Sequence, residues 1–267
     1  MAYGVAFIVL WSQLEKRFVF SPVAELLYTP NDAGLEYEDI RFQTSDGLTL
    51  HGWFIPGKDP VTEVDRPFTW VWFHGNGGNL GYRVDELALA HHQTGDDIFI
   101  FDYRGFGESD GKPSERGTYL DSRAALNHLK SRPGFDSRRM VYLGHSLGAA
   151  VAVELSLTQP PSALVLVSPF ASVRDMAGLA LPFPPAAWLL RNHYDNVARV
   201  RKINAPVLVL HGDQDDTVPL SQGRKLYEAA NQPKQFQTLE GAGHNDTYEA
   251  ASEQYCGAIE SFLAEIE

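Results

Sequence analysis

The sequence predicts an α/β fold in which an eight-stranded, mostly parallel sheet carries helices on both faces. Two observations lead to this prediction. Short, nearly continuous apolar runs recur along the chain, and such runs are typical of parallel strands that are buried on both faces. Stretches with helical spacing of apolar residues separate them. With 267 residues, the chain lies within the size range of one domain of this class.

The first two strands are expected to form an antiparallel hairpin. "EYEDIRFQT" and "LTLHGWFI" alternate polar and apolar residues, and the turn signal "SDG" stands between them. The other six strands are predicted, in chain order, at "TWVWFH", "DIFIFD", "MVYLGH", "ALVLVS", "PVLVLHG" and "KQFQTLE". Helices are predicted between them, at "GYRVDELALAHHQ", "GTYLDSRAALNHLKS" and "SQGRKLYEAANQ".

Two segments stand apart from this pattern, and the main domain is predicted over residues 21–267. Residues 1–20 contain the apolar run "VAFIVLW", which is too short to span a bilayer and has no basic region before it. We expect a helix here, either packed on the body or the remnant of a membrane anchor. The second segment, at about 170–198, carries three prolines among large apolar residues. It is expected to form a small cap over the strand ends, with a broken crossover helix as the alternative.

Composition excludes several classes of function. The net charge of −12 argues against nucleic acid as a partner, because phosphate binding needs a basic surface. Cys256 is the only cysteine and cannot form an intrachain disulfide, so we expect a cytoplasmic or membrane-associated protein that is not clearly secreted. Neither a metal-ligand spacing nor a phosphate-binding or dinucleotide motif is present, so no cofactor is expected.

The motif Gly144-His145-Ser146-Leu147-Gly148 stands where a predicted strand meets a predicted helix. A sharp turn there would expose the Ser146 hydroxyl above the sheet, and glycines are needed where neighbouring backbone comes too close for a Cβ. The start of the following helix would add N–H groups and a positive dipole end near the reacting oxygen. The pattern therefore indicates a nucleophilic serine.

Partners for this serine follow in the chain order serine, acid, histidine. The segment "HGDQDDTVP" offers Asp213, Asp215 and Asp216 after a strand, and His244 lies in the glycine-rich "GAGHND". A serine hydroxyl is a weak nucleophile, so an imidazole must take its proton and a carboxylate must orient that imidazole. We interpret His244 as the base. Spacing leaves the choice among the three aspartates open.

Five motifs together resemble the α/β-hydrolase superfamily: "FHGNGGN", "DYRGFGES", "GHSLGA", "HGDQDDTVP" and "GAGHND". The sequence is most similar to single-domain ABHD-type serine hydrolases, many of which carry an N-terminal membrane anchor. The resemblance implies the α/β-hydrolase fold and maps the acid onto Asp215, with Asp213 next. It also implies an oxyanion hole made of the backbone N–H groups of Asn76 and Leu147, with Gly77 as the alternative to Asn76.

The expected function is that of a serine esterase, a carboxylesterase acting through an acyl-enzyme. The apolar cap sequence predicts small-molecule esters with small to medium acyl or aryl groups. A thioesterase or a protein or lipid deacylase is the main alternative, and a peptidase could use the same residues. The resemblance also leaves peripheral or anchored membrane association through the N-terminus open. A non-catalytic, hydrolase-like scaffold is the hypothesis from a different class.

Overall fold

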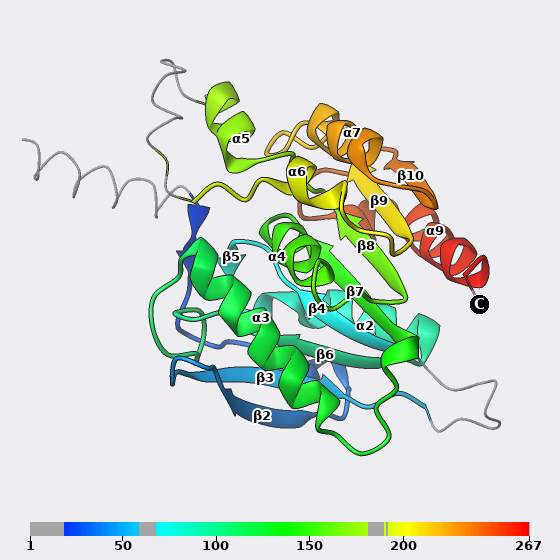
Figure 1. Ribbon diagram of the computed structural model, residues 1–267. Coiled ribbons are helices and arrows are strands. Elements are labelled where there is room, and N and C mark those ends of the chain that lie inside the picture. The colour runs from blue at the N-terminus through cyan, green and yellow to red at the C-terminus, as the bar shows by residue number, and fades with distance from the viewer. Residues whose placement is uncertain (1–18, 59–67, 181–189, 191, 267) are drawn as a thin grey trace, which may run out of the picture.

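The central feature of the fold is an eight-stranded sheet with the strand order β10-β9-β8-β7-β4-β6-β3-β2 (Figure 1). The computed structural model describes residues 19–58, 68–180, 190 and 192–266. The strands are β1 (Ser21–Pro22), β2 (Glu38–Gln43), β3 (Thr49–Ile55), β4 (Thr69–Phe73), β5 (Gly77–Gly78), β6 (Asp97–Phe101), β7 (Met140–His145), β8 (Ala163–Val167), β9 (Val207–Gly212) and β10 (Lys234–Leu239).

The α-helices are α2 (Val84–Thr94), α3 (Glu115–Lys130), α4 (Leu147–Ser156), α5 (Val173–Ala180), α6 (Asn196–Val200), α7 (Leu220–Ala229), α8 (Thr247–Ala250) and α9 (Ser252–Ala264). Three short 3-10 helices accompany them, η1 (Pro30–Ala33), η2 (Leu80–Arg83) and η3 (Ser137–Arg139).

All eight predicted strands of the sheet are confirmed. The hairpin of β2 and β3 is antiparallel and so is the pairing of β3 with β6, whereas every neighbouring pair from β6 to β10 is parallel. Burial explains the sequence patterns. Every residue of β4 and of β7 is buried, while the edge strand β2 alternates between exposed and buried positions.

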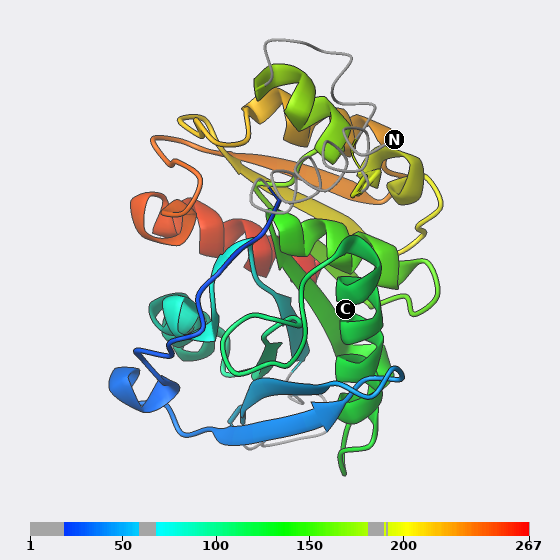
Figure 2. The same ribbon diagram turned by 90° about the vertical axis from the view of Figure 1, so that its left-hand side faces the viewer.

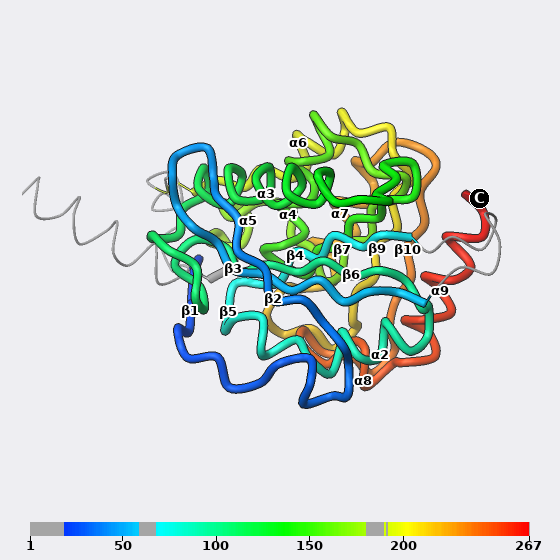
Figure 3. Tube along the Cα trace, turned by 90° about the horizontal axis from the view of Figure 1, so that it is seen from below, coloured from blue at the N-terminus to red at the C-terminus, as the bar shows by residue number. Residues whose placement is uncertain are grey.

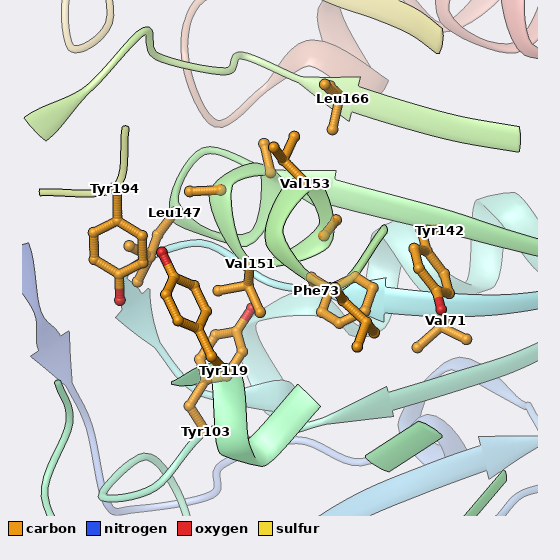
Figure 4. Packing of buried hydrophobic residues seen from close by; sticks show 14 of the residues in the cluster. Val71, Phe73, Tyr103, Tyr119, Tyr142, Leu147, Val151, Val153, Leu166 and Tyr194 are labelled. Carbon is orange, nitrogen blue, oxygen red and sulfur yellow. The ribbon is translucent and has the colours of Figure 1, made fainter. Parts of the chain in front are cut away.

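Helices cover both faces of the sheet, as Figure 3 shows by viewing it along its edge. Helices α3, α4, α6 and α7 lie on one face, and α2, α8 and α9 lie on the other. Successive strand residues therefore enter two different cores: Val71 and Phe73 pack with the first group, Trp70 and Trp72 with the second. In Figure 4, Val151 of α4 lies beside Phe73, and Leu147 of the same helix lies toward Tyr194.

The two segments set apart by the sequence are described only in part. Helix α5 lies within the predicted cap, at the top of Figure 1, but residues 181–189 and 191 of that cap lie outside the described residues. Residues 1–18, which hold most of the predicted N-terminal helix or anchor, also lie outside them. Within the described ranges, no helix is both long enough and apolar enough to cross a membrane.

A two-stranded parallel pairing between β1 and β5 was not predicted. Ser21 and Pro22 pair with Gly77 and Gly78, so the chain just after its N-terminal segment lies against the loop that follows β4 (Figure 2). A two-residue strand has no periodicity that a sequence pattern could reveal. The pairing brings Val19 to the cavity at the carboxyl ends of the parallel strands.

The packing of α2 against α9 buries a carboxyl group. Glu86 of α2 is 5% exposed, and the Tyr255 hydroxyl of α9 donates a hydrogen bond of 3.4 Å to it. Burial raises the pKa of Glu86 from 4.5 to about 7, against the opposing effects of the Arg83 charge and of the Tyr255 hydrogen bond. Because the folded-state pKa is the higher one, ionisation of Glu86 destabilises the fold as the pH rises from about 4.5 to about 7.

We therefore expect Glu86→Gln to be more stable than the wild type above pH 7, by up to about 3 kcal/mol. The gain should shrink as the pH falls toward 5, where Glu86 is protonated in the folded protein. Urea unfolding at several pH values measures this difference. The exposed Glu253→Gln on α9 is the control and should show no such pH dependence. A gain for Glu86→Gln that does not change with pH would contradict the prediction.

Candidate active site

Ser146 lies at the turn between β7 and α4, in a backbone conformation that side-chain-bearing residues rarely adopt. Its φ is 54° and its ψ −111°. The two glycines of the motif permit this turn. A Cβ on Gly148 would lie 1.8 Å from the Phe73 carbonyl oxygen, and one on Gly144 would lie 2.6 Å from the Ala149 Cα. The turn therefore holds the serine just after the carboxyl end of β7, where the residue is 7% exposed.

Three side chains from three different loops form one chain of hydrogen bonds. The Ser146 hydroxyl donates to His244 Nε2 over 3.0 Å, and His244 Nδ1–H donates to Asp215 Oδ2 over 2.7 Å. Ser146 follows β7, Asp215 follows β9 and His244 follows β10. The carboxyl ends of these parallel strands lie at the same edge of the sheet, so residues 98 positions apart meet.

Asp215 is held as a carboxylate although it is buried. Burial by itself would raise its pKa, but hydrogen bonds from His211 and His244, the charge of His244 and the Val218 backbone N–H keep the pKa well below its ordinary value. Oδ1 accepts the backbone N–H groups of Thr217 and Val218, at 3.0 and 2.7 Å. The other oxygen is thereby aimed at His244.

The two other candidate aspartates lie elsewhere. Asp213 is exposed, and its Oδ1 accepts the Gly241 N–H over 2.8 Å, which joins the loops after β9 and β10. Asp216 is exposed as well and lines the cavity beside Ser146. The structure thus brings Asp215 to His244, and gives Asp213 and Asp216 different surroundings.

Asn76 and Leu147, the two residues expected to supply backbone N–H groups to an oxyanion, line the same cavity as Ser146. Leu147 is the first residue of α4, where backbone N–H groups have no partner within the helix. The loop that carries Asn76 is held by residues outside it. The Ser21 N–H donates to the Asn76 carbonyl over 2.9 Å. The Tyr103 hydroxyl also donates to the His74 carbonyl, over 3.1 Å. Gly77 is placed in β5 and paired with Ser21.

The cavity beside Ser146 has a volume of about 430 Å³. Its apolar wall comes from the N-terminal segment, from the loop after β8, from α5 and from the loop after β9: Val19, Phe170, Val173, Met176, Leu179, Val218 and Pro219. Asp216 is the one charged side chain among its described lining residues. Such a cavity suits an apolar group and offers little to an anionic one.

Sequence reasoning missed two buried histidines at strand ends. His211 ends the run of β9, and its Nε2–H donates to the Val218 carbonyl over 2.8 Å while lying 3.4 Å from Asp215 Oδ2. His145 precedes Ser146 and contacts the backbone of His244. No spacing signal distinguishes either residue from an ordinary core histidine. No group of three or more His, Cys, Asp or Glu side chains that could hold a metal ion occurs within the described part of the chain.

Comparison with known proteins places the chain among relatives that it matches over nearly its whole length. A family model described as serine aminopeptidase, S33 matches residues 69–199. An uncharacterized protein of Mycobacterium tuberculosis is 38% identical over 99% of this chain and 92% of the relative. The alpha/beta hydrolase domain-containing protein WAV2 of Arabidopsis thaliana is 34% identical over 97% of this chain and 90% of the relative.

The fold is shared with a solved structure of an esterase from Pyrococcus furiosus. That structure superimposes with a TM-score of 0.73 at 23% identity, covering 92% of this chain and 98% of the esterase. Protein bem46 of Schizosaccharomyces pombe is 33% identical over 89% of this chain and 80% of the relative. With its eight-stranded sheet, its strained serine turn and these relatives, the chain belongs to the α/β-hydrolase family.

Proposed function

We propose that this protein is a serine hydrolase that cleaves carboxylic esters of small to medium acyl or aryl groups through an acyl-enzyme. The observation that carries the proposal is the unbroken chain of hydrogen bonds from Asp215 through His244 to Ser146 at the wall of an apolar cavity. A scaffold without activity has no need of this arrangement. The esterase fold of the structural neighbour agrees with it.

In the first half of the reaction, Ser146 Oγ attacks the acyl carbonyl carbon while His244 Nε2 takes the hydroxyl proton. Asp215 keeps the Nδ1 proton in place and stabilises the imidazolium. The backbone N–H groups of Asn76 and Leu147 donate hydrogen bonds to the carbonyl oxygen as it becomes negative. His244 then protonates the leaving alcohol, and the acyl group remains on Ser146.

In the second half, water takes the place of the alcohol, and His244 removes a proton from it as it attacks the acyl-enzyme. The same steps cleave a thioester, so a thioesterase or a protein or lipid deacylase would use the same residues. Nothing in these steps needs a cofactor.

Aminopeptidase activity is a second candidate, because one observation favours it. The family model that matches residues 69–199 is described as a serine aminopeptidase, and the Asp216 carboxylate at the cavity could pair with the ammonium group of a peptide N-terminus. Turnover of aminoacyl p-nitroanilides at a rate comparable to that of neutral p-nitrophenyl esters would favour this candidate over the esterase.

Removal of the proposed nucleophile should abolish turnover. We expect Ser146→Ala to lose p-nitrophenyl butyrate hydrolysis and fluorophosphonate labelling altogether, and Asp215→Asn to lose about 10³–10⁴-fold in kcat because the imidazole takes the wrong tautomer. Ser221→Ala and Asp213→Asn, both at exposed positions, are the matched controls and should stay close to the wild type. Full hydrolysis by Ser146→Ala would refute the proposal. A wild type that neither labels nor turns over would favour the scaffold.

The cavity should select acyl groups by length. In a p-nitrophenyl ester series from acetate to palmitate, we expect kcat/KM to rise toward butyrate and octanoate, because each buried methylene contributes about 0.8 kcal/mol. It should then fall for chains longer than the cavity. Met176→Trp, which fills part of the wall, should shift the optimum to shorter chains. Arg174→Gln, at an exposed position of the same helix, should not. A wild type that prefers acetate over every longer ester would contradict this prediction.

The Asp216 carboxylate should make the protein discriminate against anionic esters. We expect Asp216→Asn to raise kcat/KM for an anionic ester such as p-nitrophenyl hemisuccinate by about twofold to tenfold at low salt, and to leave the neutral butyrate ester nearly unchanged. The gain should shrink at high ionic strength, since Asp216 is exposed and its field is screened. Equal effects on both esters would show that its charge has no part in selectivity.

A further inference from the structure

His145 is a buried histidine next to the serine that the proposed mechanism does not use. It ends β7 and is 5% exposed. Its Nε2 lies 2.9 Å from the carbonyl oxygen of His244. A carbonyl oxygen can only accept, so Nε2 carries the proton and donates it. The His145 ring also lies against the His244 ring, with centroids 5.1 Å apart and the planes 37° from parallel.

The other side of the His145 ring faces the loop of Asn76. A Cβ on Gly75 would lie 3.3 Å from His145 Nδ1, so only a glycine leaves the ring its ordinary contact distance there. Nδ1 itself is buried and makes no hydrogen bond within the described part of the structure. The ring therefore fills the space between the loop that follows β4 and the loop that carries His244.

The electrostatic surroundings keep this imidazole neutral. Burial, followed by the charges of His244 and Arg83, holds the pKa of His145 well below its ordinary value. A neutral ring with its proton on Nε2 donates a single, fixed hydrogen bond to the His244 carbonyl. It adds no positive charge beside His244 when His244 becomes protonated during the reaction.

We propose that His145 is a positioning residue for His244: its Nε2–H bond to the His244 carbonyl and its ring contact hold the His244 loop so that Nε2 of His244 stays in line with the Ser146 hydroxyl. This inference rests on the proposed function and deepens it. Because His145 is the last residue of β7 and directly precedes Ser146, one rigid strand end sets the relative position of the nucleophile and of the base.

Two conservative variants separate the hydrogen bond from the bulk of the side chain. The amide nitrogen of Gln reaches about as far from the backbone as Nε2 of His, whereas that of Asn reaches only as far as Nδ1. His145→Gln should therefore keep the donor to the His244 carbonyl, and His145→Asn should lose it. Both variants keep a polar, uncharged side chain. The exposed His92→Asn on α2 serves as the control for the substitution itself.

With p-nitrophenyl butyrate, we expect His145→Asn to lower kcat about tenfold to a hundredfold with little change in KM, since a buried carbonyl is left unsatisfied and the base is misplaced. The rate of fluorophosphonate labelling of Ser146 should fall by the same factor. His145→Gln should recover kcat and labelling to within about threefold of the wild type. The thermal unfolding midpoint of His145→Asn should lie a few degrees below that of His145→Gln, because the unsatisfied carbonyl also lowers the stability, and both variants should stay folded at the assay temperature.

Two results would overturn the inference while the proposed function stands: equal kcat and labelling rates for the Asn and Gln variants, or losses in both that follow a drop in their unfolding midpoints. A wild type that hydrolyses no ester and takes up no fluorophosphonate would instead overturn the proposed function, and this inference with it.

Discussion

The arrangement of the site depends on one close backbone contact, between α4 and β4. A Cβ on Gly148 would meet the Phe73 carbonyl at 1.8 Å, so the first turn of α4 can lie on β4 only because this residue has no side chain. Ser146, two residues before Gly148, has a strained backbone conformation with a φ of 54°. The burial of strands β4 and β7 and of the apolar face of α4 packed on them offsets the free-energy cost of this strain (Figure 4).

Around this turn, three strands that precede proposed site residues, β4, β7 and β9, each have a buried histidine at or beside their carboxyl end. His74 follows β4 and its Nδ1–H donates to the Gly75 carbonyl over 2.8 Å, His145 ends β7 and reaches the His244 carbonyl, and His211 of β9 reaches the Val218 carbonyl. The loops that carry the proposed oxyanion donor, the proposed base and the proposed acid are thus hydrogen-bonded to residues at strand ends. Such support decides whether side chains on loops meet with the accuracy that catalysis needs.

Residues 19–22 are also part of the candidate site. Strand β1 pairs with β5, the Ser21 N–H donates to the Asn76 carbonyl and Val19 lines the cavity. Phe20 packs edge-on against Tyr194, a buried residue near the end of the predicted cap region, with ring centroids 6.4 Å apart. Residues 19–22 thereby contact both the loop that carries Asn76 and the end of the predicted cap region.

The sequence by itself determined the class of fold and its eight sheet strands, and it singled out Ser146 and His244 as candidate site residues. Each of these leaves a local signal: an apolar run, a turn or a glycine-flanked motif. Local patterns did not decide which of three aspartates is the candidate acid, and only the resemblance to a family favoured Asp215. The tertiary structure decided what depends on residues distant in the chain: that Asp215 reaches His244, that Ser21 pairs with Gly77, and that His145 contacts the His244 backbone. The physical reason is that hydrogen bonds between loops form only after the strands have brought those loops together.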